Sequence, residues 1–312
     1  MQPIRTVAVQ GAGAMGAYFA GKFFDTPGFS VSLIAQGERA GRLARDGLII
    51  NGRRYDIPVI DPESAGAQAD LIIVALKHHH LAEAVHDLKH VIGPRTIILS
   101  VMNGLGSEEY IGSVYGLDKI LYAVSVGIDA VREGNRIEYT AGGTHYFGEA
   151  DNTELNPKVL RVREAFDKAG IHYKIPEDML RILWWKFMIN VGINQASAVM
   201  GAPYGVFQRS ADAHAFMESL MREAVALAKA ADVDLREEDL QEWFSFLRTL
   251  SPEGKTSMLQ DIEAGRKTEV EIFAGKAVEM GTAHNIPTPV NAAVLRIIHV
   301  LEEMIGATPI ES

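Results

Sequence analysis

The sequence predicts an α/β protein in which a doubly wound parallel sheet forms the N-terminal domain and an all-helical domain follows. In the first half, short apolar runs typical of buried strands alternate with helical patterns, which is the rhythm of a parallel sheet covered by helices. Beyond about Pro176 the strand patterns stop, and helical patterns carry the rest of the chain. We therefore expect two domains, residues 1–176 and 177–312.

The expected elements follow in chain order. Strands of the sheet are expected at 6–10, 30–35, 71–76, 96–101 and 121–126, and a helix at 17–24. Two short strands, at 136–140 and 144–147, are expected to form a hairpin-rich tail of the same sheet. In the second domain, helices are expected at 179–199, 211–231, 237–250, 256–284 and 289–305.

A glycine-rich turn follows the first expected strand. It has the pattern Gly-X-Gly-X-X-Gly and consists of Gly11, Ala12, Gly13, Ala14, Met15 and Gly16. Between a strand and a helix, the first glycine permits a tight turn, the second lets a pyrophosphate approach the backbone, and the third lets the helix pack closely on the strand. The pattern predicts a dinucleotide site, and a merely well-packed glycine turn is the alternative.

The end of the second expected strand bears on the choice of dinucleotide. An NAD site usually has an acidic residue about 20 residues beyond the glycines, whereas an NADP site has a cation there. Here Gln36 ends the strand, and Arg39 and Arg42 follow within two helical turns, with Glu38 among them. This pattern favours NADP, unless both arginines simply solvate a helix face.

A nearly apolar segment, residues 182–193, predicts a buried helix. Its polar exceptions, Lys186 and Asn190, are followed by Asn194, so the three side chains share one face. Burial of an unpaired ammonium is costly or lowers its pKa, so Lys186 is expected either to have a structural partner or to transfer a proton. The two amides suit a small polar ligand beside it. Alternatively, Lys186 extends to the surface and the amides bond to the backbone.

The helix expected at 256–284 carries further polar groups. Glu269 should be paired, because it lies in an apolar stripe of that helix. Its partner is expected to be either Arg266, which would make the pair a structural one, or Lys186, which would make it a functional one. Ser257 lies about 120° from the stripe, so it is expected to act near the helix start, where it could hold a substrate carboxylate. The stripe is formed by Ile262, Phe273 and Met280.

Two polar residues come directly after expected strands, where ligands of a doubly wound sheet bind. Lys77 follows the strand at 71–76 and could meet the cofactor ribose or the substrate. Asn103 opens the segment Asn-Gly-Leu-Gly and could orient the nicotinamide or the substrate. The alternative is ordinary loop chemistry for both. No metal site is expected, because the adjacent side chains of His78, His79 and His80 point in different directions.

Composition is that of a cytoplasmic enzyme. The 312 residues are 47% hydrophobic and 22% charged, include no cysteine, and contain no apolar run long enough for a membrane. The net charge of −10 and the lack of basic stretches argue against a nucleic-acid partner. The chain begins directly in an expected strand, so we expect no signal peptide and a cytoplasmic location. Trp243, Phe244 and Phe246 form either a homodimer surface or a core edge.

Together, these residues resemble the ketopantoate reductase family, also called 2-dehydropantoate 2-reductases, along essentially the whole chain. The order and spacing of the matching segments make the resemblance specific. It implies a Rossmann domain that binds the dinucleotide, an all-helical domain for substrate binding and catalysis, and a substrate held in the cleft between them. The matching segments are 11–16, 76–77, 103–106, 143–149, 185–190 continued to Asn194, 257–261 and 268–269.

The resemblance implies reduction of 2-dehydropantoate to (R)-pantoate by NADPH, a step in pantothenate and coenzyme A synthesis. Hydride passes from the nicotinamide to the keto carbon. Lys186 is then the general acid that protonates the developing alkoxide, and Glu269 pairs with it and contacts the substrate. The resemblance also implies that the substrate is held by Asn190, Asn194 and Ser257, and that Lys77 and Asn103 lie near the cofactor and the reacting carbonyl.

Two positions depart from the family pattern. Gln36 stands where the family usually has an arginine, so Arg39 or Arg42 would have to contact the 2′-phosphate. Tyr204 stands where the family has a small polar residue, and its phenol could reshape the substrate pocket. The alternatives are a reductase of another branched 2-oxo acid that uses the same lysine, and an NADP(H)-binding sensor without turnover. The presence of Lys186 and Glu269 argues against the sensor.

Overall fold

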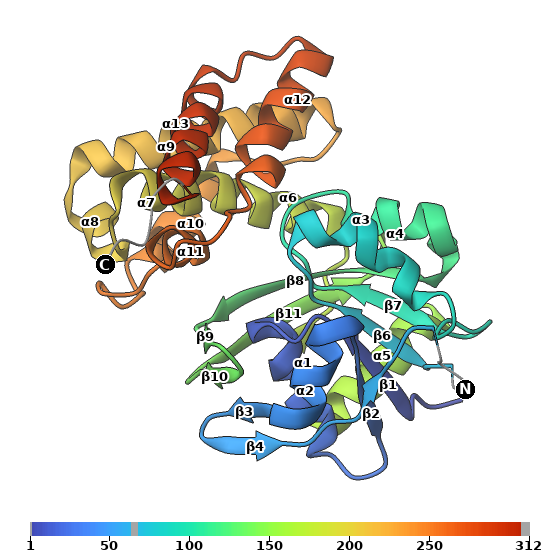
Figure 1. Cartoon of the computed structure of the whole chain (residues 1–312). Coiled ribbons are helices and arrows are strands. Elements are labelled where there is room, and N and C mark those ends of the chain that lie inside the picture. Colours follow the sequence, from blue (N-terminus) through green and yellow to red (C-terminus); the bar gives the residue numbers. More distant parts are fainter. Residues whose placement is uncertain (1, 64–67, 307–312) are drawn as a thin grey trace, which may run out of the picture. The chain divides into compact units, whose positions relative to one another are not determined.

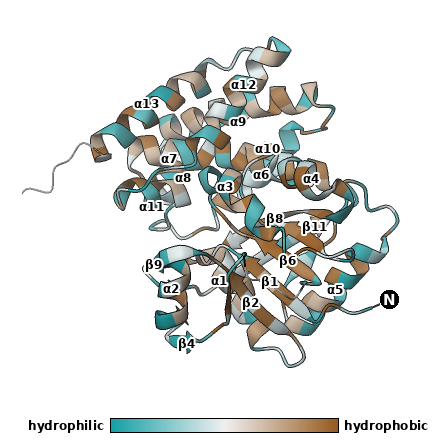
Figure 2. Ribbon diagram, turned by 45° about the vertical axis from the view of Figure 1, so that its right-hand side comes forward, coloured by the Kyte–Doolittle hydropathy of each residue, from teal (hydrophilic) through white to brown (hydrophobic). Residues whose placement is uncertain are grey.

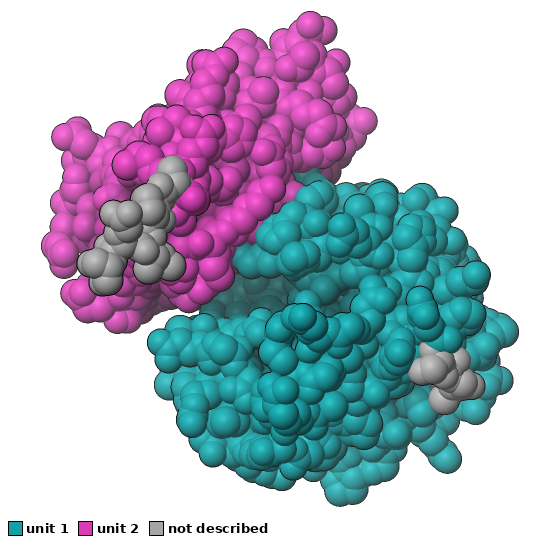
Figure 3. Space-filling view, viewed as in Figure 1, with its two compact units in different colours: residues 1–182 teal, residues 183–312 magenta. Residues whose placement is uncertain are grey.

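A computed structural model describes residues 2–63 and 68–306 of the chain (Figure 1). The chain divides into two compact units, Met1–Ile182 and Leu183–Ser312, which are coloured separately in Figure 3. The division falls within helix α6 (Met179–Ile189), a few residues after the expected change of domain at 176. No helix among the described residues is both long and apolar enough for a membrane span.

An eight-stranded sheet forms the centre of the first unit, in the order β12-β11-β8-β7-β6-β1-β2-β5. All five expected parallel strands are confirmed, with ends that shift by one or two residues. Strand β1 pairs with β2 on one side and β6 on the other, so the chain changes direction across the sheet at β1. The strands are β1 (Thr6–Gln10), β2 (Ser30–Ile34), β5 (Val59–Ile60), β6 (Leu71–Val74), β7 (Ile97–Ser100), β8 (Ile120–Ile128), β11 (Gly142–Gly148) and β12 (Tyr173–Lys174).

Helices cover both faces of this sheet, and the alternation of side chains along the strands creates two cores. On one face, Val7 and Val9 pack in the same cluster as residues of helices α1 and α5. On the other, Ala8 belongs to a cluster with residues of α3 and α4. Figure 2 shows the central strands as hydrophobic, as expected for strands buried on both faces. The helices of this unit are α1 (Ala14–Phe24), α2 (Gly37–Asp46), α3 (Leu81–Ala84), α4 (Ser107–Tyr115) and α5 (Pro157–Ala169), with short 3₁₀ turns at His78–His80, Val85–Leu88 and Leu117–Lys119.

The hairpin-rich tail is only partly as expected. The strand expected at 144–147 joins the main sheet as β11, antiparallel to β8. The strand expected at 136–140 does not, because β10 (Arg136–Glu138) belongs to a separate sheet of order β4-β3-β10-β9. Gly134, with φ +60°, turns the chain back between β9 (Val131–Glu133) and β10. The other strands of this sheet are β3 (Leu48–Ile50) and β4 (Arg53–Tyr55).

The described part of the second unit is entirely helical. Helices were expected at 211–231, 237–250 and 289–305, and helices are found in all three places. Buried Gln195 joins three elements, because its side-chain amide donates to Val191 O at 2.7 Å and Asn291 Oδ1 at 3.0 Å, and its oxygen accepts from Ala274 N at 2.8 Å. The helices are α6, α7 (Gln195–Met200), α8 (Tyr204–Arg209), α9 (Ala211–Ala230), α10 (Glu237–Leu247), α11 (Ser257–Glu263), α12 (Ala274–His284) and α13 (Pro289–Gly306).

The single helix expected at 256–284 is wrong. Helix α11 ends at Glu263, Gly265 follows with φ +65°, and α12 begins only at Ala274 after a 3₁₀ turn at Val270–Ile272. A positive φ is incompatible with a continuing right-handed helix, and the apolar periodicity of the two helices hides this break.

Trp243 and Phe244 on α10 are each only 4% exposed, and Phe246 is half-buried. Two of these three aromatic side chains therefore belong to the core of the second unit.

A buried carboxyl group connects β7 to α4. The Ser107 hydroxyl donates to Glu108 Oε2 at 2.8 Å, so in the 2.7 Å contact between Ser100 Oγ and Ser107 Oγ the Ser100 hydroxyl is the donor. All three side chains are buried. Burial raises the pKa of Glu108 to about 7, against the opposing effect of the Ser107 hydrogen bond.

This carboxyl group predicts a pH dependence of stability. A carboxyl whose pKa is raised on folding stabilises the protein fully below its unfolded-state pKa of 4.5, and this contribution is lost as the pH rises to about 7. Between these values the free energy of unfolding of the wild type should fall by up to about 3 kcal/mol relative to Glu108→Gln. Urea titrations across this pH range measure the difference, with exposed Glu154→Gln as control. Parallel curves for wild type and Glu108→Gln would contradict the prediction.

Candidate active site

The glycine-rich turn between β1 and α1 has the backbone that a pyrophosphate site requires. Gly11 has φ +100°, and a Cβ there would lie 2.3 Å from Ala75 O. A Cβ on Gly16 would lie 1.7 Å from Gly11 O, so α1 can approach β1 this closely only with glycine. Around Gly13, by contrast, no described atom lies within 4 Å of an added Cβ. The turn is therefore closed at its first and third glycines and open at the second.

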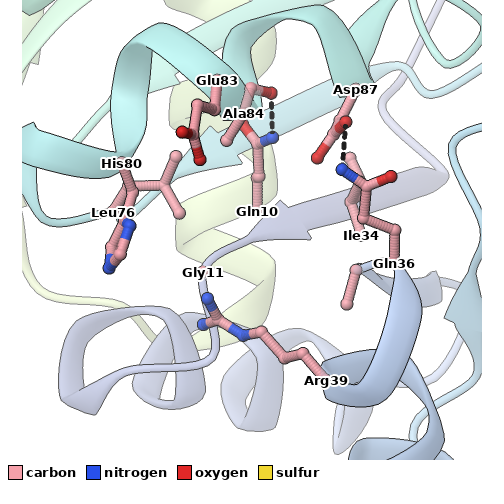
Figure 4. Close-up of a pocket in the computed structure, with 11 residues that line it drawn as sticks. Gln10, Gly11, Ile34, Gln36, Arg39, Leu76, His80, Glu83, Ala84 and Asp87 are labelled. Carbon is pink, nitrogen blue, oxygen red and sulfur yellow. Dashed lines mark hydrogen bonds between the residues drawn. The ribbon is translucent and has the colours of Figure 1, made fainter.

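A pocket lies at the carboxyl ends of β1, β2 and β6, next to this turn (Figure 4). This is the place where the strand order changes direction, which is the usual ligand site of a doubly wound sheet. The pocket is lined by Gln10, Gly11, Ile34, Ala35, Gln36, Arg39, Leu76, His80, Glu83, Ala84 and Asp87.

Arg39 and Arg42, both on α2, differ in their surroundings. Arg39 is half-buried, and Figure 4 shows its guanidinium extending toward Gly11. Burial and the nearby charge of Arg42 lower the pKa of Arg39, which forms no ion pair or hydrogen bond with the described residues. Arg42 is exposed and lies 3.7 Å from Glu38. Of the two cations expected at this end of the site, only Arg39 lines the pocket.

Gln36 lines the same pocket, and its side chain has a partner that the sequence did not suggest. Its amide nitrogen donates to Asp87 Oδ1 at 3.2 Å (Figure 4). Burial raises the pKa of Asp87. The two residues are 51 positions apart, in α2's cap and in the 3₁₀ turn at Val85–Leu88, so only the fold brings them together.

Lys77 and Asn103 lie beyond the same edge of the sheet. Strands β6 and β7 are parallel neighbours in which Val74 is opposite Ser100, and each of the two polar residues lies three positions after its strand. Asn103 is followed by Gly104 and Gly106, whose φ values are +88° and +97°. The neighbouring histidines form the 3₁₀ turn at His78–His80, and no cluster of potential metal ligands occurs among the described residues.

The second unit carries the polar stripe of Lys186, Asn190 and Asn194. Lys186 is half-buried on α6, and burial lowers its pKa to about 8. It forms no hydrogen bond or ion pair with the described residues. Asn194 Nδ2 donates to Asn190 Oδ1 at 3.1 Å, whereas Asn190 Nδ2 is buried without a hydrogen-bond partner among the described residues. The stripe thus presents an ammonium and an amide, both of them hydrogen-bond donors.

The helix changes its winding at this stripe, which the sequence did not predict. Residues Asn190–Asn194 form a π turn between α6 and α7. Single π turns inside helices are rare and are often found at functional sites. The buried indole nitrogen of Trp185, beside Lys186, is another donor without a partner among the described residues.

Glu269 lies in different surroundings from those expected, whereas Ser257 lies at a helix start as expected. Glu269 is 6% exposed and precedes the 3₁₀ turn at Val270–Ile272, outside any α-helix. Arg266, one of the two alternative partners considered for Glu269, donates from Nε to Asp261 Oδ1 at 3.0 Å. Ser257 is exposed and is the first residue of α11, as expected from its place near a helix start. The pairing of Glu269 with Lys186 stays a prediction.

Comparison with known proteins decides the family. The family model described as ketopantoate reductase PanE/ApbA matches residues 7–152, and the model of its C-terminal domain matches residues 178–302. The chain belongs to the ketopantoate reductase family. Its members are named for an oxidoreductase reaction, and the two matched regions correspond to the parallel-sheet unit and the helical unit.

Similar proteins cover nearly the whole chain. The 2-dehydropantoate 2-reductase of Pyrococcus horikoshii is 26% identical over 97% of this chain and 99% of its own length. Among solved structures, D-mandelate dehydrogenase with NADH and anilino(oxo)acetate has a TM-score of 0.88 at 20% identity, covering 97% of this chain and all of that one. A dimeric ketopantoate reductase from Staphylococcus aureus has a TM-score of 0.81 at 20% identity, covering 96% of this chain and all of that one. These likenesses show the same fold.

The glycine geometry predicts that Gly13→Ala will mainly weaken dinucleotide binding, whereas Gly16→Ala will mainly lower stability. Gly13→Ala should cost at most about 1 kcal/mol of stability, yet weaken dinucleotide binding, because its methyl group lies where a pyrophosphate would meet the backbone. Gly16→Ala should cost about 3 kcal/mol or more, because the methyl group collides with Gly11 O. Urea unfolding and fluorescence titration with NADPH measure the two effects. Full NADPH affinity in Gly13→Ala would contradict this assignment of the turn.

Proposed function

We propose that this protein reduces 2-dehydropantoate to (R)-pantoate with NADPH, and that Lys186 is the general acid. The observation that carries the proposal is that the Lys186 ammonium and the Asn190 amide nitrogen, on one helical stripe, both lack a hydrogen-bond partner among the described residues. Buried polar groups normally have partners, so these two donors point to a polar ligand that accepts hydrogen bonds. A 2-oxo acid has such acceptors in its keto and carboxylate oxygens.

The first unit fits a dinucleotide. The open backbone at Gly13 and the N-terminus of α1 suit a pyrophosphate, which helix N-termini bind through their free amide groups. The unpaired Arg39 guanidinium suits the 2′-phosphate of NADPH, while Gln36 suits the ribose. Lys77 and Asn103 then serve the nicotinamide end. When bound, NADPH supplies the hydride.

Lys186 holds the proton that the reaction needs. As the keto carbon receives hydride, negative charge grows on the former carbonyl oxygen, and the Lys186 ammonium stabilises this charge and transfers its proton there. The products would be the hydroxy acid, the oxidised dinucleotide and a neutral lysine, which regains a proton from the solvent. A pKa of about 8 keeps Lys186 mostly protonated at neutral pH while it remains a better acid than an ordinary lysine. Asn190, Asn194 and Ser257 hold substrate oxygens, and Glu269 contacts the substrate.

The surroundings of Tyr204 support a second candidate substrate. It is the first residue of α8, burial raises its pKa, and its ring packs so closely on Gly254 that a Cβ added to Gly254 would lie 2.9 Å from the ring. Such a rigid phenol could favour another branched 2-oxo acid over 2-dehydropantoate. Oxidation of NADPH with 2-dehydropantoate and with 2-oxoisovalerate, measured in parallel, separates the two substrates. NADPH binding without turnover of any 2-oxo acid would instead support a sensor.

Removal of the proposed acid should abolish most of the activity. Lys186→Ala is expected to lower kcat by about 10²- to 10⁴-fold, while NADPH binding and thermal stability change little. Exposed Lys229→Ala on α9 is the matched control and should keep wild-type activity. If Lys186→Ala retained its kcat, another group would have to donate the proton.

The pKa of Lys186 predicts the direction of the pH dependence. Reduction needs the protonated amine, so kcat/KM for reduction should fall as the pH rises through about 8, and oxidation of (R)-pantoate should rise over the same range. Steady-state rates from pH 6 to about 10 test this, because the limb near 8 should be missing from the residual activity of Lys186→Ala. The same limb in that variant would assign it to a different group.

A further inference from the structure

We propose that Asp87 is a specificity-determining residue of the cofactor pocket, which selects for a ribose 2′-hydroxyl and against a 2′-phosphate. It opposes the preference that Arg39 provides, so NADH remains a usable cofactor beside NADPH. This inference rests on the proposed function, because it concerns the end of the dinucleotide that carries the difference between the two cofactors.

The first argument is position. In doubly wound sheets, the residue just past the second strand meets the ribose 2′ group, and here that residue is Gln36. Its amide donates to Asp87 Oδ1 at 3.2 Å, and both side chains line the pocket (Figure 4). The Asp87 carboxylate is therefore hydrogen-bonded to Gln36, the residue at the position that meets the ribose. It can accept a hydrogen bond from a 2′-hydroxyl directly or hold Gln36 in place to do so.

The second argument is charge. A phosphate monoester carries about −1.5 to −2 charges at neutral pH, and like charges brought together without solvent weaken binding. Glu83 lines the same wall as Asp87, and Asp61 and Glu63 are close enough to add to the rise in the Asp87 pKa that burial causes, while the charge of His86 lowers that pKa. This wall of the pocket is acidic.

The third argument is the separation of the opposing groups. Arg39 comes from α2, and its guanidinium extends toward Gly11, while Asp87 and Glu83 lie on the other side of the pocket (Figure 4). No ion pair between Arg39 and a described acidic residue neutralises either side. Attraction and repulsion of a 2′-phosphate therefore come from different elements, and a substitution can remove one without the other.

Measuring how tightly the full-length protein binds nucleotides, with no 2-oxo acid present, tests the proposal. NADPH, NADH, 2′,5′-ADP and AMP are titrated into the wild type and Asp87→Asn. The asparagine keeps the oxygen that accepts from Gln36 and loses only the charge. Affinity for NADPH and 2′,5′-ADP should rise about tenfold, whereas affinity for NADH and AMP should stay within about threefold of wild type.

Two further variants show where the charge matters. Glu83→Gln removes a carboxylate from the same wall that is not bonded to Gln36, and it should raise NADPH affinity less than Asp87→Asn does. Glu38→Gln removes a carboxylate from α2 outside the pocket lining and should leave all four affinities unchanged. Unchanged thermal melting shows that each variant is folded.

An unchanged ratio of NADPH to NADH affinity in folded Asp87→Asn would overturn the proposal. So would a wild type that binds NADPH at least a hundredfold more tightly than NADH, because NADH would then not be a usable cofactor beside NADPH. These outcomes differ from a failure of the proposed function. A protein that binds both dinucleotides but reduces no 2-oxo acid would lose its substrate assignment and keep this one.

Discussion

The close approach of α1 to β1 is the contact on which the first unit depends. Because Gly16 has no side chain, the first turn of α1 lies directly against the carbonyl oxygen of Gly11. Strand β1 pairs with β2 and β6 at once, and residues at the ends of all three strands line the pocket. The same six residues therefore pack α1 against β1 and leave the backbone open at Gly13.

The second unit depends on a buried amide instead of a close backbone contact. Gln195 follows the π turn directly and bonds to Val191, Asn291 and Ala274, which holds α7 against α12 and α13. Glu223 on α9 adds to this frame, because it accepts from the first free amides of α13, at Val290 and Asn291. The polar stripe of Lys186 and the two asparagines is thereby placed on a helix that cannot rotate freely. Two of its donors, the Lys186 ammonium and Asn190 Nδ2, have no hydrogen-bond partner among the described residues.

Much of the fold could be predicted because its determinants are local. The strand patterns, the glycine-rich turn and the stripe at 182–193 each lie within a short stretch of sequence. The separate sheet of β10 could not be found, because Ile137 alternates with exposed residues in the same way in either sheet. The break at Gly265 was hidden between two helices of matching periodicity, and with it the pairing of Arg266 with Asp261. The contact of Gln36 with Asp87 depends on tertiary structure, and no spacing in the sequence predicts it.

The π turn at Asn190–Asn194 also has a consequence for the length of the helix. A π turn holds one residue more than an α-helical turn. Deletion of a single residue there would restore regular winding and leave the residues on both sides facing as before, because the extra residue is taken up within the turn itself. The same deletion elsewhere in the helix would rotate the residues beyond it by about 100° about the helix axis. The turn is therefore a point at which this helix can change in length while its two ends keep their orientation.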